Sequence, residues 1–198
     1  MERNYPRNPF CRYADDGIAH CRTEVEALEL LKALDARFKE CGLELHPEKT
    51  KIVYCKDDDR RGSYPYNSFD FLGFTHICST RRKSGKFKVH RKTIGKRLRR
   101  KAKEVRQILY RHRDKPVPEQ GRWLRSVVQG HFNYYGVPGN REALDTFRTQ
   151  IGHAWLHALR RRSRKGRNLT WERMQRQMMK WIPTAKVLHP YPNQRFCV

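Results

Sequence analysis

Two adjacent aspartates, Asp15 and Asp16, are the residues of this chain whose types and spacing best suit chemistry. Apolar residues flank the pair on both sides, and Gly17 follows it directly. Asp and Gly favour tight turns, so the stretch Phe10–Cys21 predicts a β-hairpin with both carboxylates at its tip. Two negative charges this close repel unless a cation lies between them, and oxygen ligands suit Mg²⁺. A solvated Asp-Asp-Gly turn without a metal is the competing interpretation.

The net charge of +24 over 198 residues indicates a polyanionic partner. Residues 1–80 carry 12 Lys/Arg and 14 Asp/Glu, whereas residues 81–198 carry 32 Lys/Arg and 6 Asp/Glu. A near-neutral part, net −2, therefore precedes a strongly basic part, net +26. This asymmetry is typical of a protein that binds nucleic acid through one of its modules.

The six cysteines show neither the paired spacing of a zinc site nor the density of a small secreted domain. We expect free thiols in a reducing compartment. No apolar run approaches the ~20 residues that a membrane span requires. The expected location is cytoplasmic, with no membrane partner and association with ribonucleoprotein.

Residues 1–90 predict an alternation of strands with one helix. A capping box formed by Thr23 and Glu26 opens a helix over about residues 23–41, with an apolar stripe at Val25, Leu28, Leu31 and Phe38. Short strands are expected at residues 43–45 and 52–55. A further strand over residues 68–78 is expected to carry a bulge or close backbone approach at Gly73, before a returning strand at 87–89.

Residues 93–182 predict four helices separated by Pro116–Pro118, Gly136–Asn140 and a basic loop at 163–167. Pro118 is expected at the first position of the second helix, which would bury Trp123, Val127 and Tyr134. Asn140 and Thr170 are expected to cap the third and fourth helices. Aromatic side chains in this part could stack on bases, but their place on the apolar stripes favours core packing; they are Trp123, Tyr134, Tyr135 and Trp155.

Three motifs occur in the order found in reverse transcriptase palms. Tyr13–Asp16 (YADD) resembles the metal-binding motif, Gly42–Thr50 (GLELHPEKT) looks like the next palm motif, and Phe69–Phe74 (FDFLGF) resembles the primer grip. The helical part, with Gly130–Gly136 (GHFNYYG), resembles the maturase (thumb) region of group II intron-encoded proteins. The chain is similar to the C-terminal part of a group II intron reverse transcriptase/maturase.

The resemblance implies an α+β fold, with a partial palm at residues 1–90, a helical thumb/maturase domain at 91–182 and an extended tail at 183–198. It implies that Asp15 and Asp16 bind Mg²⁺ for nucleotidyl transfer, and that Lys49 assists at the triphosphate. An ordinary turn lysine is an equally good interpretation of Lys49. The residues implied to contact the primer or nucleotide are Tyr13, Ala14, Phe71, Leu72 and Gly73.

The partners implied are structured intron RNA, whose splicing the protein would assist, an RNA/DNA primer–template, and a dNTP in the full enzyme. Residues 81–113 hold 16 Lys/Arg against Glu104 alone, and a second basic cluster follows at 160–167. These residues would hold phosphates rather than read bases. The expected RNA-binding residues are Arg91, Lys92, Lys96, Arg97, Arg99, Arg100, Lys101, Lys103, Arg160, Arg161, Arg162, Arg164, Lys165 and Arg167.

The sequence also departs from the pattern of a complete palm, which has a carboxylate on an earlier strand and fingers that bind the triphosphate. Glu2 is the sole acid before Tyr13. We expect the C-terminal portion of an enzyme from a truncated or split gene, inactive alone and completed by an N-terminal half supplied in trans. The alternative is a non-catalytic RNA-binding splicing cofactor with a vestigial palm.

Overall fold

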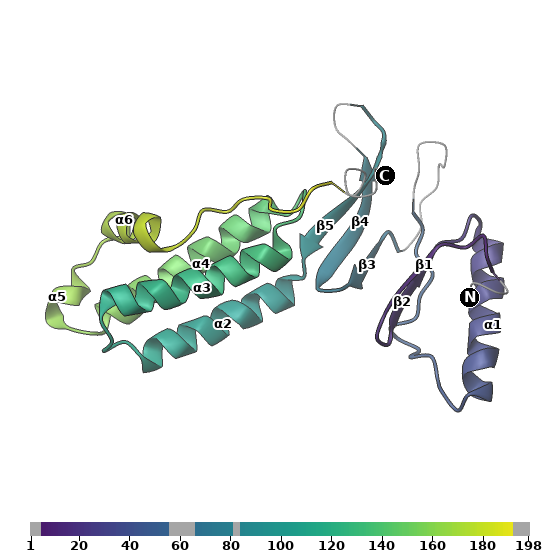
Figure 1. Cartoon of the computed structure of the whole chain (residues 1–198), viewed down its shortest axis with the longest axis horizontal. Coiled ribbons are helices and arrows are strands. Elements are labelled where there is room, and N and C mark those ends of the chain that lie inside the picture. Colours follow the sequence, from purple (N-terminus) through teal and green to yellow (C-terminus); the bar gives the residue numbers. More distant parts are fainter. Residues whose placement is uncertain (1–4, 56–65, 81–83, 192–198) are drawn as a thin grey trace.

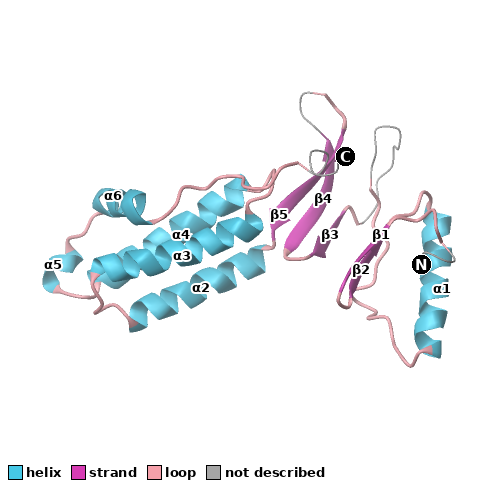
Figure 2. Ribbon diagram, viewed as in Figure 1, coloured by secondary structure: helices cyan, strands magenta, loops and turns pink. Residues whose placement is uncertain are grey.

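The computed structural model describes residues 5–55, 66–80 and 84–191. Within these ranges, two small antiparallel sheets and a group of helices follow one another along an elongated molecule (Figures 1 and 2), which confirms the α+β class. The elements are β1 (Phe10–Tyr13), β2 (Asp16–Ala19), α1 (Glu24–Glu40), β3 (Ser68–Phe71), β4 (Phe74–Thr80), β5 (Phe87–Thr93), α2 (Gly95–Arg111), α3 (Val117–Tyr135), α4 (Arg141–Arg160), α5 (Arg164–Arg167) and α6 (Trp171–Trp181).

The first sheet is the predicted hairpin of β1 and β2, paired from Phe10 with Ala19 to Tyr13 with Asp16. Its connection to α1 depends on Asn8, which is buried although it is polar. The Asn8 amide donates to the Glu26 carboxylate at 2.9 Å and to the His20 carbonyl at 3.2 Å. One side chain therefore joins the end of the hairpin to the start of the helix.

The capping box of α1 is confirmed. Thr23 accepts a hydrogen bond from the Glu26 amide at 3.2 Å, and the Glu26 carboxylate accepts one from the Arg22 amide at 2.6 Å. The bond from the Arg22 amide is the largest of several that lower the pKa of Glu26. The predicted apolar stripe is wrong in part: Leu30 is the buried residue of this helix, whereas Val25 and Leu28 are exposed.

Two short strands predicted after α1 do not form. Residues 43–45 and 52–55 have no assigned secondary structure and belong to no sheet within the described part of the chain. Tyr54 donates one main-chain hydrogen bond to the carbonyl of Tyr66 at 3.1 Å. An apolar run becomes a strand only where a partner strand lies alongside it and pairs with it over several residues.

The second sheet has the order β3-β4-β5, all antiparallel. Of the bulge or close backbone approach predicted at Gly73, the close approach is present and the bulge is not. Phe71 pairs with Phe74 and leaves Leu72 and Gly73 as a two-residue turn. Both have positive φ, +48° and +82°, which is the requirement of a type I′ turn.

The helical part surrounds a core built from α2, α3, α4 and α6. The third and fourth predicted helices correspond to α4 and α6, in which Phe147, Trp155 and Met174 are fully buried; core packing is thus confirmed for Trp155. The α3 stripe is displaced by one residue: Leu124, Val128 and Phe132 are buried, whereas Trp123 and Val127 lie at the edge of the core and Tyr134 is exposed. Tyr134 faces the β3–β4 turn, so core packing is the wrong interpretation of this residue.

Helix ends differ in how well the sequence predicted them. Thr170 caps α6, where it accepts from the Arg173 amide, as expected. Asn140 lies at the start of α4 but its side chain makes no capping bond, and Pro118 occupies the second position of α3. The basic loop predicted at 163–167 contains the one-turn helix α5.

No disulfide joins the cysteines of the described ranges, and Cys197 lies outside them together with Glu2 and Arg81–Lys83. None of the described helices is long and apolar enough to cross a lipid bilayer. The domain boundaries at residues 90 and 182 stay predictions.

Candidate functional site

The tip of the β1–β2 hairpin presents two open carboxylates. Ala14 and Asp15 form its two-residue connection, and Asp16 begins β2 directly opposite Tyr13. Residues opposed across two strands project from the same face, so Tyr13 and Asp16 share one side of the hairpin. Both aspartates are exposed, and no side-chain hydrogen bond or ion pair joins either of them to another described residue. Their oxygens are therefore available to a ligand.

The donor chemistry of this tip fits Mg²⁺, which takes oxygen ligands and commonly binds through one or two carboxylates plus substrate phosphates. The described residues contain no group of three His, Cys, Asp or Glu side chains close enough to hold a metal ion. Asp15 and Asp16 thus offer a partial site. A bound ion there would hold and polarise phosphate oxygens.

The β3–β4 turn is fixed against the end of α3. The Tyr134 hydroxyl donates to the Leu72 carbonyl at 2.9 Å, and the Gly73 carbonyl accepts from the Ile94 amide at 3.1 Å. A Cβ on Gly73 would lie 3.0 Å from the Tyr135 hydroxyl and 3.4 Å from the Arg97 guanidinium. Glycine is needed here both for its positive φ and for this close approach.

Aromatic packing reinforces the same junction. Phe74, the first residue of β4, is buried, with its ring stacked 6.0 Å from that of Tyr134 and edge-on 5.2 Å from that of Tyr135. Phe71 precedes the turn and is half-buried. The primer-grip residues predicted from the sequence, Phe71 to Gly73, therefore form a rigid corner between the second sheet and the helices.

The hairpin tip and this corner are within electrostatic range of each other. Burial raises the pKa of Tyr134, the neighbouring Tyr135 raises it further, and Tyr13 adds a smaller contribution in the same direction. The charge of Arg97 opposes these effects. Tyr13 of the YADD motif and Arg97 of α2 thus both act electrostatically on Tyr134.

Lys49 is not shown to join this group. It lies exposed in a turn in which the Thr50 amide donates to the His46 carbonyl at 2.9 Å. No recorded contact connects its ammonium group to Asp15 or Asp16 within the described ranges. Its role at a triphosphate stays a prediction.

Asn140 is a positioning residue that sequence reasoning missed. It is buried, and its side chain accepts from the Thr93 amide at 2.9 Å while donating to the Thr93 hydroxyl and the Tyr135 carbonyl, both at 2.8 Å. These bonds tie the end of β5 to the end of α3. The sequence predicted that Asn140 caps a helix. The neighbouring residues do not distinguish a capping asparagine from one that bonds to distant groups such as Thr93.

The predicted basic residues of β5 and α2 lie on the surface, where Arg91 is half-buried and the others are exposed. Among the described ion pairs of α2, Glu104 accepts from Lys101 at 3.4 Å and lies 3.9 Å from Arg100. The first turn of α2 carries cations and no acid. Positive charge at a helix N-terminus opposes the helix dipole and destabilises the helix, so this placement favours binding of an anion over stability.

The second basic cluster lies at the other end of the helical part, where α4 ends and α5 follows (Figure 1). Its described cations are exposed: Arg160, Arg161, Arg162, Arg164 and Arg167. Lys165 is part of α5. The described cations of the two basic clusters thus lie at the surface, and the binding of RNA by these clusters stays a prediction.

Comparison with known proteins agrees with the arrangement of the first part of the chain. Residues 1–76 match the family described as reverse transcriptase (RNA-dependent DNA polymerase). The match covers the acidic hairpin, α1, the segment with Lys49 and the β3–β4 turn. No curated protein matches the chain. The similarity to this family thus spans the first part of the chain and ends within β4.

Proposed function

We propose that this chain forms part of a reverse transcriptase of the group II intron type, in which Asp15 and Asp16 bind Mg²⁺ and the helical part binds RNA. The observation that carries the proposal is the junction at Tyr134. It fixes the Leu72–Gly73 turn against the basic helical part, with Tyr13 of the acidic hairpin in electrostatic range. A polymerase needs the primer end, the metal and the duplex held in one such fixed relationship.

Each element has a defined task in this proposal. The carboxylates hold the ion that steadies the phosphates of the nucleotide and the primer end. Tyr13 and Ala14 contact the terminal base pair, and the main chain at Gly73 contacts the primer. The cations at the start of α2 neutralise phosphates of the duplex, in a position where they cost the helix stability.

The reverse transcriptase palms that this chain resembles also use a carboxylate from an earlier strand. We therefore propose that a third carboxylate comes from another polypeptide segment, and that the chain alone does not polymerise. The experiment is extension of a DNA primer on an RNA template in Mg²⁺. The chain would be tested alone and together with the fingers and first palm strand of a group II intron reverse transcriptase.

Extension in the mixture that is lost with Asp15→Asn and retained with Glu29→Gln would support the proposal. Glu29 is an exposed acid on α1, so its substitution matches the change in charge. Extension that is indifferent to Asp15, or that the chain carries out by itself, would refute it.

The second candidate is a splicing cofactor that binds RNA without catalysis. The observation that favours it is the absence, among the described residues, of any three grouped metal ligands. It predicts tight, salt-sensitive binding of structured intron RNA and support of splicing that Asp15→Asn leaves unchanged, with no extension in any mixture.

A further inference from the structure

An open hollow of about 620 Å³ lies at the far end of the helical part, where the ends of α2 and α4 meet α5. We call it the distal hollow. Five of its lining residues are arginines and none is acidic; the arginines are Arg113, Arg160, Arg161, Arg164 and Arg167. α4 has 20 residues and is therefore about 30 Å long, so the distal hollow lies roughly one helix length from Asn140 and the β3–β4 corner.

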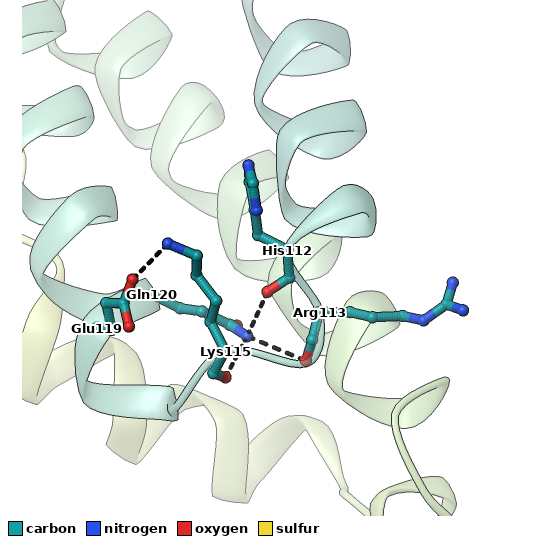
Figure 3. Close-up of polar contacts among 5 residues, drawn as sticks. All are labelled: His112, Arg113, Lys115, Glu119 and Gln120. Atoms are coloured by element: carbon teal, nitrogen blue, oxygen red, sulfur yellow. Dashed lines mark hydrogen bonds and ion pairs between the residues drawn. The ribbon is translucent and has the colours of Figure 1, made fainter.

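The surroundings of the distal hollow are ordered by hydrogen bonds. The buried Gln120 amide donates to the carbonyls of His112, Arg113 and Lys115 at 3.1, 3.2 and 2.9 Å, while its oxygen accepts from the Trp155 indole at 2.8 Å. Figure 3 shows that the Arg113 side chain points away from these hydrogen bonds. The α2–α3 connection, which contains Arg113, is thus held in place by the buried Gln120 side chain.

Individual arginines are held as well. The Arg160 Nε donates to the Leu169 carbonyl at 2.9 Å, and the Arg113 guanidinium lies 4.7 Å from the centre of the Tyr110 ring. Arg162, beside the hollow, donates to the Lys115 carbonyl at 3.2 Å. These contacts use part of each guanidinium and leave its remaining N–H groups for a ligand.

The potential in the hollow is strongly positive. A hydrogen bond from Arg113, the charge of Arg113 and a hydrogen bond from Arg161 lower the pKa of Tyr110. Burial lowers the pKa of His157, and the charges of Arg161, Arg106 and Arg160 lower it further. Neighbouring arginines thus contribute to both pKa shifts, and within the described ranges no ion pair joins the five arginines to a carboxylate.

We propose that the distal hollow binds phosphate groups of a nucleic-acid strand, as a discrete site separate from the basic face of α2. Arginine suits this ligand because its planar group binds phosphate oxygens in pairs, and several guanidiniums around one hollow match a concentrated anion. The volume is in the range of ligand-binding clefts. The phosphate groups could come either from a terminal phosphate of the strand or from internal phosphodiesters at a sharp bend.

The site deepens the proposed function and rests on it, since it assumes that the helical part binds nucleic acid. Held about one helix length from the corner, the hollow would give a bound RNA a second fixed point. A partner gripped at two points on one rigid group of helices is fixed in orientation as well as in position. Sequence reasoning missed Tyr110 and His157 here, and it assigned Arg113 to the first basic cluster, because the end of α2 meets Arg160–Arg167 only through the fold.

The test compares two double variants in equilibrium binding to an RNA hairpin that carries either a 5′-phosphate or a 5′-hydroxyl. Arg164→Gln with Arg167→Gln removes two charges from the hollow, and Arg173→Gln with Arg176→Gln removes two exposed charges from α6 as a matched control. Each phosphate contact adds about 0.9 to the slope of log affinity against log salt for duplex. The hollow variant should reduce the slope by about 2, and the control by much less. Circular dichroism checks that both variants fold.

A larger loss in the hollow variant with the 5′-phosphate RNA alone would assign a terminal phosphate, and an equal loss with both RNAs would assign internal phosphodiesters. Equal losses in the two double variants would mean a diffuse charge effect and would overturn the site. If neither double variant loses RNA affinity, the proposed phosphate site is also overturned. Wild-type chain that binds no RNA would instead refute the proposed RNA binding of the helical part.

Discussion

The Tyr134 hydroxyl lies 2.9 Å from the main-chain carbonyl of Leu72 and donates a hydrogen bond to it, across 62 positions of sequence. This bond joins the last turn of α3 to the β3–β4 turn. The angle between the sheet and the helices therefore depends on contacts at one corner, which Phe74 and Asn140 reinforce.

Tyr134→Phe keeps the ring stacking and removes the bond. We expect a loss of about 0.5–1.5 kcal/mol in the free energy of unfolding and faster amide exchange at the Gly73 turn. Tyr110→Phe is the control, since its hydroxyl lies at the distal end of the helices. Unchanged exchange at the turn in the Tyr134 variant would show that the bond does not hold the corner.

Gly73→Ala should be more damaging than an ordinary glycine substitution at positive φ. The new Cβ would lie 3.0 Å from the Tyr135 hydroxyl, in addition to the strain at φ +82°. Gly42→Ala is matched, because Gly42 has φ +68° and no atom within 4 Å of its Cβ position. Denaturant unfolding should give a loss of about 1 kcal/mol for Gly42→Ala and about 2–3 kcal/mol for Gly73→Ala. Equal losses would contradict the close approach.

Lys96→Glu should stabilise the protein while weakening RNA binding. It replaces a cation in the first turn of α2 with an acid that favours the helix dipole, for a gain of about 1 kcal/mol in unfolding free energy. Lys103→Glu makes the same charge change in the middle of the helix and lacks this gain. Thermal unfolding and RNA affinity are measured on both variants. A Lys96→Glu variant that is more stable but binds RNA with unchanged affinity would show that the first turn of α2 does not contact RNA.

His131 should make stability depend on pH. It is buried, stacked 3.8 Å from Phe147, and its Nε2 has no recorded hydrogen-bond partner among the described groups. Burial lowers its pKa to about 4, with a smaller contribution from the charge of Lys101. The unfolded chain binds the proton first, so the stability due to this group is complete above about pH 6.5 and is lost as the pH falls towards 4.

One pKa unit corresponds to about 1.4 kcal/mol, so the loss across that range is about 3 kcal/mol. In His131→Phe the unfolding free energy should depend less on pH over this window, whereas the exposed control His112→Gln should keep the wild-type dependence. A His131 variant with the wild-type pH profile would mean that this histidine is not neutral in the folded protein.

Local signals in the sequence were sufficient for some parts of this fold. The Tyr13–Asp16 hairpin and the caps at Thr23 and Thr170 are specified by neighbouring residues, and the structure has each of them. The exposed cations of α2 also follow from their spacing on a helix. These features depend on contacts within a few residues of each other.

Features that depend on distant partners could not be predicted in the same way. Within the described part of the chain the apolar run Ile52–Cys55 belongs to no sheet, and the Asn140 side chain bonds to Thr93 rather than capping its own helix. Nothing in the sequence distinguishes Gln120 from other polar residues of α3, yet its side chain donates hydrogen bonds to the α2–α3 connection. Buried polar side chains are fixed by tertiary packing, so their roles appear only when the elements are assembled.

The most direct test of metal binding at Asp15 and Asp16 is cleavage by Fe²⁺ bound in place of Mg²⁺, with ascorbate present. The chain is combined with the fingers and first palm strand of a group II intron reverse transcriptase and with an RNA/DNA primer–template. Radicals formed at the metal cut both polypeptide and nucleic acid close by. We predict peptide cuts around Asp15 and Asp16 and primer cuts at its 3′ end, both lost in Asp15→Asn and retained in Glu29→Gln. Cuts that are absent from the hairpin, or that persist in Asp15→Asn, would contradict the claim that these carboxylates hold a metal at the primer end.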